Sequence, residues 1–139
     1  MRNFFIGLFF SLMVFFITGC QEVLDIEFVN NTDFTLVCQF DYRELSDTIL
    51  HENTPWPKGV QKTDCIIKPH STHLSRFNQS DFIGLEEKGL CRSFYFFDVD
   101  TINAVPWERI RSENIVVKKV YIYSLNDIKY KFDNVIYIP

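Results

Sequence analysis

The chain contains little glycine and little proline, five of each in 139 residues. It has no internal repeat, no low-complexity tract and no sign of a second domain, which favours one ordinary globular domain. Its longest apolar run, Phe4 to Gly19, is 16 residues long. That run is shorter than the roughly 20 residues that a membrane-spanning helix needs.

Positive charge is also scarce. The chain has 14 Lys and Arg against 18 Asp and Glu, a net charge of −4. Arg2 is the only charged residue before Cys20, so residues 20–139 carry 13 basic and 18 acidic side chains, a net charge of −5. An acidic domain without a basic cluster is a poor partner for nucleic acid or for anionic lipid headgroups. We therefore expect no nucleic-acid partner.

Catalytic motifs are missing from the sequence as well. His51, Ser93 and Asp98 are residue types that hydrolases use, but no nucleophile motif surrounds any serine. The neighbouring carboxylates Glu86 and Glu87 are typical of a solvated helix face. We therefore predict that the protein is not an enzyme and needs no cofactor. A hydrolase with an unrecognised site is the alternative.

Two groups of residues have part of the chemistry of a metal site. His70 and His73 could bind zinc together with Cys65 or Cys91, but the two histidines straddle a predicted turn and no helix holds them on one face. Residues 98–100 resemble part of a calcium loop that lacks its glycine and its distal glutamate. Neither group is complete, so we predict no metal site.

The strongest motif in the sequence lies at its N-terminus. Arg2 and the terminal amine precede the apolar run, which ends in Ile17-Thr18-Gly19-Cys20. This is the layout of a secretory signal, and its end resembles the lipobox of bacterial lipoproteins. The resemblance implies cleavage after Gly19 and a diacylglyceryl thioether on Cys20. The alternative is an uncleaved signal anchor with an incidental cysteine.

The same resemblance implies a location and a domain plan. We expect a signal peptide at 1–19, a lipidated tether at 20–23 and a β-rich globular domain at 24–139. The four tether residues reach roughly 13 Å when extended, so the domain should lie close to the membrane. Gln21 is not the aspartate that retains lipoproteins at the inner membrane, which favours an outer-membrane location in the cell envelope and leaves surface exposure open.

Hydrophobic periodicity predicts strands in the rest of the chain. Residues 24–28 and 34–42 alternate between apolar and polar around Asn30-Asn31-Thr32-Asp33, a pattern typical of a β-hairpin. Leu90 to Val99 contains Phe94-Tyr95-Phe96-Phe97, a continuous apolar run of strand length, which predicts a central strand covered on both faces. Further strands are predicted at 65–68, 71–74, 116–123 and 135–138, and short helices at 81–88, at 107–113 and after Ser124. The sequence therefore predicts a mainly β, antiparallel, sandwich-like single domain with two or three short helices, preceded by a cleaved signal helix.

The C-terminal part of the chain resembles a known group of proteins. Its motifs are Trp107-Glu108-Arg109-Ile110-Arg111, Ser124-Leu125-Asn126-Asp127-Ile128 and Val135-Ile136-Tyr137-Ile138-Pro139. With the lipobox and the Asn-Asn-Thr-Asp turn, they resemble small uncharacterised lipoproteins of Gram-negative gut anaerobes. The resemblance covers the lipobox, 26–42 and roughly 92–139, and it departs where a tryptophan is expected before the last strand. It implies class and location and no activity.

Three cysteines remain after Cys20, namely Cys38, Cys65 and Cys91. An envelope location permits disulfides, and an odd number of cysteines leaves one thiol unpaired. Cys38 lies on the apolar face of its predicted strand, where a cysteine is usually a small buried hydrophobe. Cys65 and Cys91 both lie at strand edges and are the candidate disulfide pair. The alternative is that all three thiols stay reduced.

Four aromatic residues are candidates for partner binding: Trp56, Tyr121, Tyr123 and Tyr137. Trp56 stands between two prolines, and the tyrosines would share one face if the last strands were neighbours. Flat aromatic rings suit glycans and protein hot spots, although such rings also pack beneath helices. The sequence thus predicts a lipid-anchored, non-catalytic module that binds a protein or glycan partner. An immunity- or inhibitor-type protective lipoprotein is the alternative.

We expect the substitution Cys20→Ser to abolish lipid labelling and to move the protein from the membrane fraction to the soluble fraction. The reason is that the serine hydroxyl cannot replace the thiol that forms the thioether. Metabolic labelling with a fatty acid and fractionation of the cells measure both effects. An intact Met1 terminus on the native protein, seen by mass spectrometry, would contradict the processing.

Overall fold

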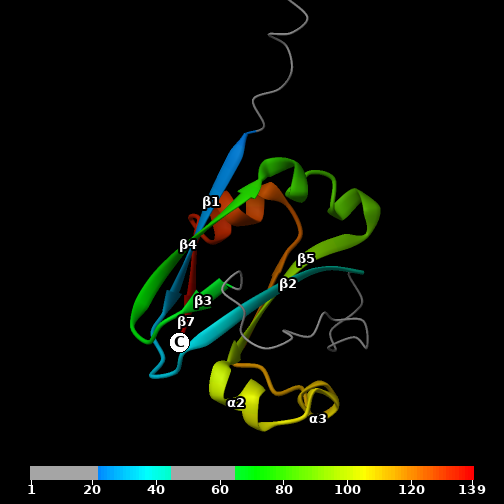
Figure 1. Ribbon diagram of the computed structural model, residues 1–139. Helices are drawn as coiled ribbons and strands as arrows, with labels where there is room; N and C mark the ends of the chain where they lie inside the picture. Colours follow the sequence, from blue (N-terminus) through cyan, green and yellow to red (C-terminus); the bar gives the residue numbers. More distant parts are fainter. Residues whose placement is uncertain (1–21, 45–64) are drawn as a thin grey trace, which may run out of the picture.

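The computed structural model describes residues 22–44 and 65–139, which form two packed β-sheets with short helices (Figure 1). The predicted signal peptide, Cys20 and the loop around Trp56 lie outside these residues. Within the described ranges, no helix is long and apolar enough to cross a membrane.

The first sheet has three strands in the order β4-β1-β7. Strand β1 (Val23–Asn30) is central and pairs antiparallel with β4 (Ser71–Asn78) along its whole length. Strand β7 (Val135–Ile138) pairs parallel with the second half of β1. Alternate residues of β1 are buried and exposed, so one face of the sheet points into the protein, as the sequence predicts.

The second sheet has four strands in the order β3-β2-β5-β6, and all of its pairs are antiparallel. The strands are β3 (Cys65–Ile67), β2 (Leu36–Glu44), β5 (Leu90–Asp98) and β6 (Lys118–Ile122). Residues 91–97 of β5 are all buried. The prediction of a central strand that is covered on both faces is therefore confirmed, as is the mainly β, sandwich-like fold.

Strand β5 contributes to two hydrophobic cores because its side chains alternate in direction. Phe94 and Phe96 lie in the core between the sheets, where both rings contact Phe28 at centroid distances of 5.5 and 5.3 Å. Tyr95 and Phe97 lie on the outer face of the sheet, in a smaller core with Ile102 and Ile110 from two helices. The large apolar content of this strand thus holds three layers together.

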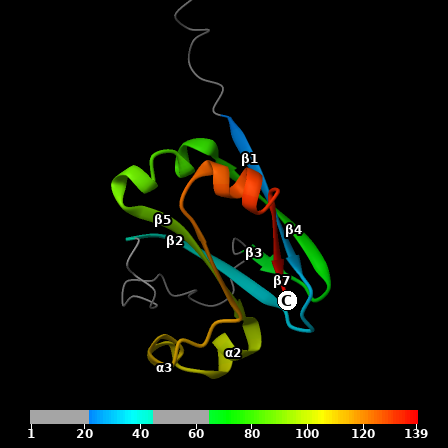
Figure 2. The same ribbon diagram turned by 180° about the vertical axis from the view of Figure 1, so that it is seen from behind.

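Helices α2 (Val99–Ala104) and α3 (Trp107–Ser112) cover that outer face, at the end of the molecule away from the start of β1 (Figures 1 and 2). Helix α3 is confirmed close to the predicted bounds. Helix α2 was not predicted. It begins because the Asp98 side chain caps it, accepting hydrogen bonds from the backbone N–H groups of Asp100 and Thr101.

The remaining helical segments are single turns. The predicted helix at 81–88 is two 3₁₀ turns, η1 (Gln79–Phe82) and η2 (Glu86–Lys88), separated near Gly84, whose φ of 69° is left-handed. The turn after β6 is the π-helical η3 (Asp127–Lys131). It starts with the predicted cap, because Ser124 Oγ accepts a hydrogen bond from the Asp127 backbone N–H.

Residues 24–42 do not form the predicted hairpin. Strands β1 and β2 belong to different sheets, so residues 31–35 are a corner that carries the chain from one sheet to the other. The alternation of apolar residues is the same for a hairpin and for a corner, because both bury one face of each strand. Residues 68–70 make a second crossing of the same kind, between β3 and β4.

The side chain of Asn30, which is fully buried, joins these two corners. Its amide nitrogen donates to the carbonyl oxygens of Phe34 at 2.8 Å, Lys68 at 3.0 Å and Ile67 at 3.3 Å. Its amide oxygen accepts hydrogen bonds from the backbone N–H and the hydroxyl of Thr32, at 3.0 and 2.7 Å. One side chain therefore satisfies polar groups of both crossings, and we call it the Asn30 clamp.

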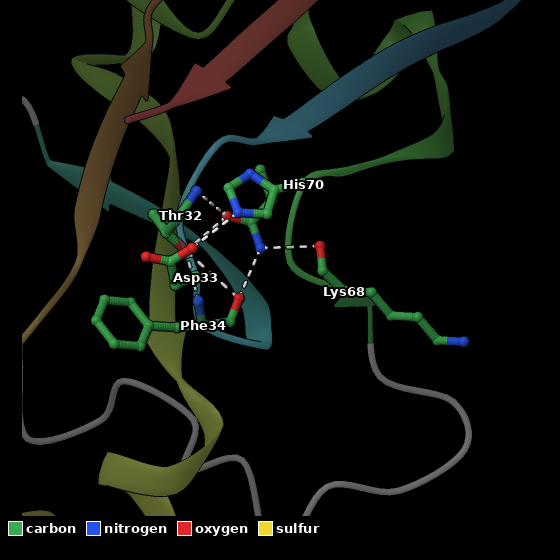
Figure 3. Close-up of polar contacts among 6 residues, drawn as sticks. Thr32, Asp33, Phe34, Lys68 and His70 are labelled. Atoms are coloured by element: carbon green, nitrogen blue, oxygen red, sulfur yellow. Dashed lines mark hydrogen bonds and ion pairs between the residues drawn. The ribbon is translucent and has the colours of Figure 1, made fainter.

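Two more contacts lie around the clamp, one within the first corner and one between the two corners (Figure 3). Thr32 Oγ1 accepts a hydrogen bond from the Phe34 backbone N–H at 3.1 Å. On the surface, His70 Nε2 and Asp33 Oδ1 are 2.8 Å apart. The Asn-Asn-Thr-Asp segment thus bonds its own main chain, and further bonds join it to the second corner.

We expect Asn30→Ala to lower the free energy of unfolding by about 3 kcal/mol or more, because it removes the five hydrogen bonds by which a fully buried side chain links the two corners. Urea denaturation of the mature chain measures the change. The matched control is Asn31→Ala, in the next position but exposed, which should cost less than about 0.5 kcal/mol. Equal effects of the two substitutions would contradict the clamp.

Candidate functional site

A groove of about 800 Å³ opens between the two sheets on the side of β3 and β4. Among the described residues, β3 pairs only with Leu36, Val37 and Cys38 of β2. On that side, no described strand pairs with the rest of β2, and none pairs with the outer edge of β4. The groove is therefore bordered by two strand edges whose backbone groups have no ladder partner among the described residues.

The floor of the groove contains a buried cation. Arg92 is on β5, is only 5% exposed and points into the space between the sheets. Its guanidinium carbon lies 4.6 Å from the ring centre of Phe40, 5.3 Å from that of Phe77 and 5.5 Å from that of Phe82. Asp81 Oδ2 is 3.8 Å from Arg92 Nη1. Three aromatic faces and one carboxylate thus surround this positive charge.

The rings around Arg92 also pack against one another. Phe77 makes edge-to-face contacts with Phe40, Phe82 and Phe94, with ring centres 5.6–5.8 Å apart. Phe40 is nevertheless 46% exposed, because it stands at the mouth of the groove. The exposed apolar side chains of Val23 and Leu74 line the same groove. The lining also contains polar side chains, among them Gln39 and Asn78, so the groove combines apolar and polar surface around a buried charge, as binding sites do.

Two thiols lie at the β3 end of the groove. Cys38 and Cys65 are directly opposite each other on β2 and β3, and both pack into the core between the sheets. Cys65 Sγ is 3.7 Å from Ser75 Oγ. Hydrogen bonds from Cys38 and Ser75 lower the pKa of Cys65, against the effect of its partial burial. Burial, followed by the hydrogen bond and charge of Cys65, raises the pKa of Cys38.

The structure does not pair Cys65 with Cys91. Cys91 lies on β5 opposite Arg43, five residues along the strand from the position opposite Cys38. Its thiol is 3.6 Å from the Ser93 hydroxyl, on the face of the sheet that points away from the groove. The three thiols are free in the structure, and the neighbour of Cys65 is Cys38.

The three candidate tyrosines do not share one face. Tyr121 is on β6 in the four-stranded sheet and Tyr137 is on β7 in the three-stranded sheet, so the strands are not neighbours in one ladder. Tyr121 and Tyr123 are half-buried and line a shallow hollow of about 230 Å³ with Lys131 and Phe132. Tyr137 is 59% exposed on the outer face of the other sheet. Trp56 lies outside the described residues.

The candidate catalytic and metal-binding residues also lie apart from one another. Asp98 caps α2 and Ser93 is fully buried beside Cys91. His70 contacts Asp33, whereas His73 lines the groove. In the two described ranges, no three or more His, Cys, Asp or Glu residues are grouped as metal ligands would be. The zinc and calcium groupings considered from the sequence are therefore not assembled there.

Sequence reasoning did not find Arg92 or the rings around it. The only signal in the sequence is that Arg92 lies two residues before the apolar run 94–97, within the segment predicted to be a buried strand. A charged residue in the middle of a buried strand must find partners, because burying an unpaired charge costs several kcal/mol. That rule predicts that Arg92 is paired, but only the fold shows that the partners border a groove.

We expect Arg92→Ala to lower the free energy of unfolding by roughly 3 kcal/mol, because it removes the packing of three rings against the guanidinium and leaves Asp81 without its partner. Thermal and urea denaturation measure the loss. Arg76→Ala is the matched control: Arg76 lines the same groove but is exposed, and its pair with Asp25 is on the surface. The control should leave the midpoint unchanged. A larger effect at Arg76 would show that the buried cation does not support the fold.

Comparison with known proteins adds nothing to this geometry. No protein-family model, curated protein or solved structure matches the chain. Any inference about function therefore rests on the groove and its borders.

Proposed function

We propose that the protein is a lipid-anchored lipoprotein of the cell envelope whose domain binds an extended segment of a partner protein and performs no catalysis. The observation that carries this proposal is the groove, which is bordered by edges of β2 and β4 that have no ladder partner in the part of the chain that the structure describes. An extended peptide can add to such an edge through main-chain hydrogen bonds, while pockets beside the edge select its side chains.

The lining of the groove suits this mode of binding. On the inward face of β4, every second residue is half-buried, so His73, Ser75 and Phe77 would meet alternate side chains of an added strand. Phe40 and Leu74 offer exposed apolar surface at the mouth. The buried charge of Arg92 favours a segment with an acidic or otherwise electron-rich group among its apolar residues.

The position of the groove suits a tethered protein. Val23, the first residue of β1, lines the groove and lies three residues after Cys20, which is roughly 10 Å of extended chain. If Cys20 carries the lipid, the groove opens on the membrane side of the domain. The helices α2 and α3 then lie at the far end (Figure 1). A partner segment at or near the membrane surface would be within reach.

The other candidate functions have less support. A glycan site built from Tyr121, Tyr123 and Tyr137 lacks a common platform, since those residues lie on two sheets. A hydrolase would need a nucleophile beside a base, and Ser93 and Asp98 are engaged elsewhere. An immunity- or inhibitor-type role remains the second candidate, because the same groove would serve if the bound segment belonged to a toxin.

The proposal is tested by placing a photo-crosslinking amino acid at Leu74, which is 55% exposed in the groove. In cells, we expect one discrete adduct with an envelope protein, whose crosslinked peptide mass spectrometry identifies as one short segment. The matched control is the same amino acid at Tyr130, which is 83% exposed on η3 and does not line the groove.

The control position should give no adduct with that partner. The adduct at Leu74 should also disappear when Phe40→Lys places a second cation at the mouth of the groove. Equal crosslinking from Leu74 and Tyr130 would contradict the groove as the binding site. An adduct at Leu74 that persists in Phe40→Lys would contradict it as well. An adduct with glycan alone would support the glycan alternative.

A further inference from the structure

We propose that Cys38 and Cys65 form a reversible disulfide across β2 and β3, and that Cys65 is the thiol through which the bond is made and broken. The pairing follows from the sheet, because the two residues are directly opposite each other in an antiparallel ladder. It does not depend on what occupies the groove, so it stands or falls apart from the proposed function.

The backbone already meets the demands of a disulfide. Directly opposed residues of antiparallel strands have Cα atoms about 4.5–5.5 Å apart and side chains on the same face of the sheet. Disulfides need Cα atoms about 4.4–6.8 Å apart. Cys38 and Cys65 both contact the core between the sheets, so their sulfur atoms point to the same side. The bond can form without moving either strand to a new register.

The two thiols differ in access. Cys38 is 3% exposed and lies at the floor of the groove, whereas Cys65 is half-buried at the end of a short edge strand. A small disulfide that enters the groove can therefore reach Cys65 before it can reach Cys38. This is the arrangement of an attacking thiol and a resolving thiol.

The pKa values of the two thiols support the same order of attack, with Cys65 first. Hydrogen bonds from Cys38 and from Ser75, whose oxygen is 3.7 Å away, lower the pKa of Cys65. Burial raises the pKa of Cys38. Since the thiolate is the attacking species, Cys65 reacts first at neutral pH. Cys91 is buried on the other face of the sheet and takes no part.

The reaction is an ordinary thiol–disulfide exchange in two steps. The Cys65 thiolate attacks one sulfur of a disulfide R–S–S–R, forming a Cys65–S–S–R mixed disulfide and releasing one thiolate RS⁻. Cys38 then loses its proton and attacks Cys65 Sγ, which releases the second RS⁻. The protein loses two protons and two electrons, and R–S–S–R is reduced to two molecules of RSH. Excess RSH reverses both steps.

The disulfide would link β3, which has the fewest described residues of the four strands in the second sheet, covalently to β2. Within the described ranges, β3 pairs with β2 at three positions, and Cys38–Cys65 is the last of them, beyond which β2 continues without a described partner on that side. A covalent link there fixes one end of the groove. Oxidation should therefore make local opening of β3 rarer, and reduction of the disulfide should make it as frequent as before.

The experiment uses the purified mature protein with its three thiols reduced. It is equilibrated in buffers of reduced and oxidised glutathione, its free thiols are alkylated in denaturant, and its peptides are mapped by mass spectrometry. We expect a linked peptide containing Cys38 and Cys65 in the oxidised buffers, full return of both thiols in the reduced buffers, and an alkylated Cys91 throughout.

Three variants test the order of the steps. Cys91→Ser should behave as the wild type, and Cys38→Ser should accumulate glutathione on Cys65. Cys65→Ser should leave Cys38 alkylated only after denaturation, because Cys38 is buried. In the wild type, Cys65 should be alkylated faster than Cys38, because hydrogen bonds lower the pKa of Cys65 whereas burial raises the pKa of Cys38.

Peptide mapping of the wild-type protein by mass spectrometry is enough to contradict the proposal, whether or not each variant folds. The proposal would be contradicted if the thiols of Cys38 and Cys65 both remained free in oxidised glutathione. A bond that includes Cys91, or one that forms only between two chains, would also contradict it. Glutathione attached first to Cys38 would refute the assigned order of attack.

Discussion

The fold depends on one buried amide. The described strands require the chain to cross from one sheet to the other four times, and two of these crossings, at residues 31–35 and 68–70, meet at Asn30. The Asn30 side chain donates hydrogen bonds to both of these crossings and accepts hydrogen bonds from Thr32 in the first. Buried polar groups must be paired, and few residue types other than asparagine carry both functions in so short a side chain. The same crossings place β3 beside β4 and so position the groove.

The groove lies between the two sheets, beside β3 and β4. Among the described residues, β3 covers three residues of β2, while β4 runs the full length of β1, so the sheets are closed at the corner and open toward the start of β1. Arg92 lies in this opening because β5 alternates in direction, and the rings of Phe40 and Phe77 cover its charge. The groove and the pair of opposed thiols therefore lie at the same place, where β3 pairs with β2.

The sequence predicts those parts of the structure that local patterning determines. The continuous apolar run of β5, the alternation of β1 and the cap at Ser124 are all confirmed. It does not predict which sheet each strand joins, since residues 24–42 alternate in the same way in a hairpin and in a corner. The neighbours of Cys65, Arg92 and Tyr137 depend on that choice. For this reason the cysteine and tyrosine groupings differ from the structure, although their strands were predicted.

The central claim is that the open edges of β2 and β4 receive a partner segment. Hydrogen exchange of backbone amides in native membrane vesicles, compared with the purified protein, measures this directly. We expect slower exchange in the vesicles at the amides of β4 that do not bond to β1 and at those of β2 beyond Cys38, with no change in α2 and α3. Unchanged exchange at both edges, together with protection of another surface, would contradict the claim.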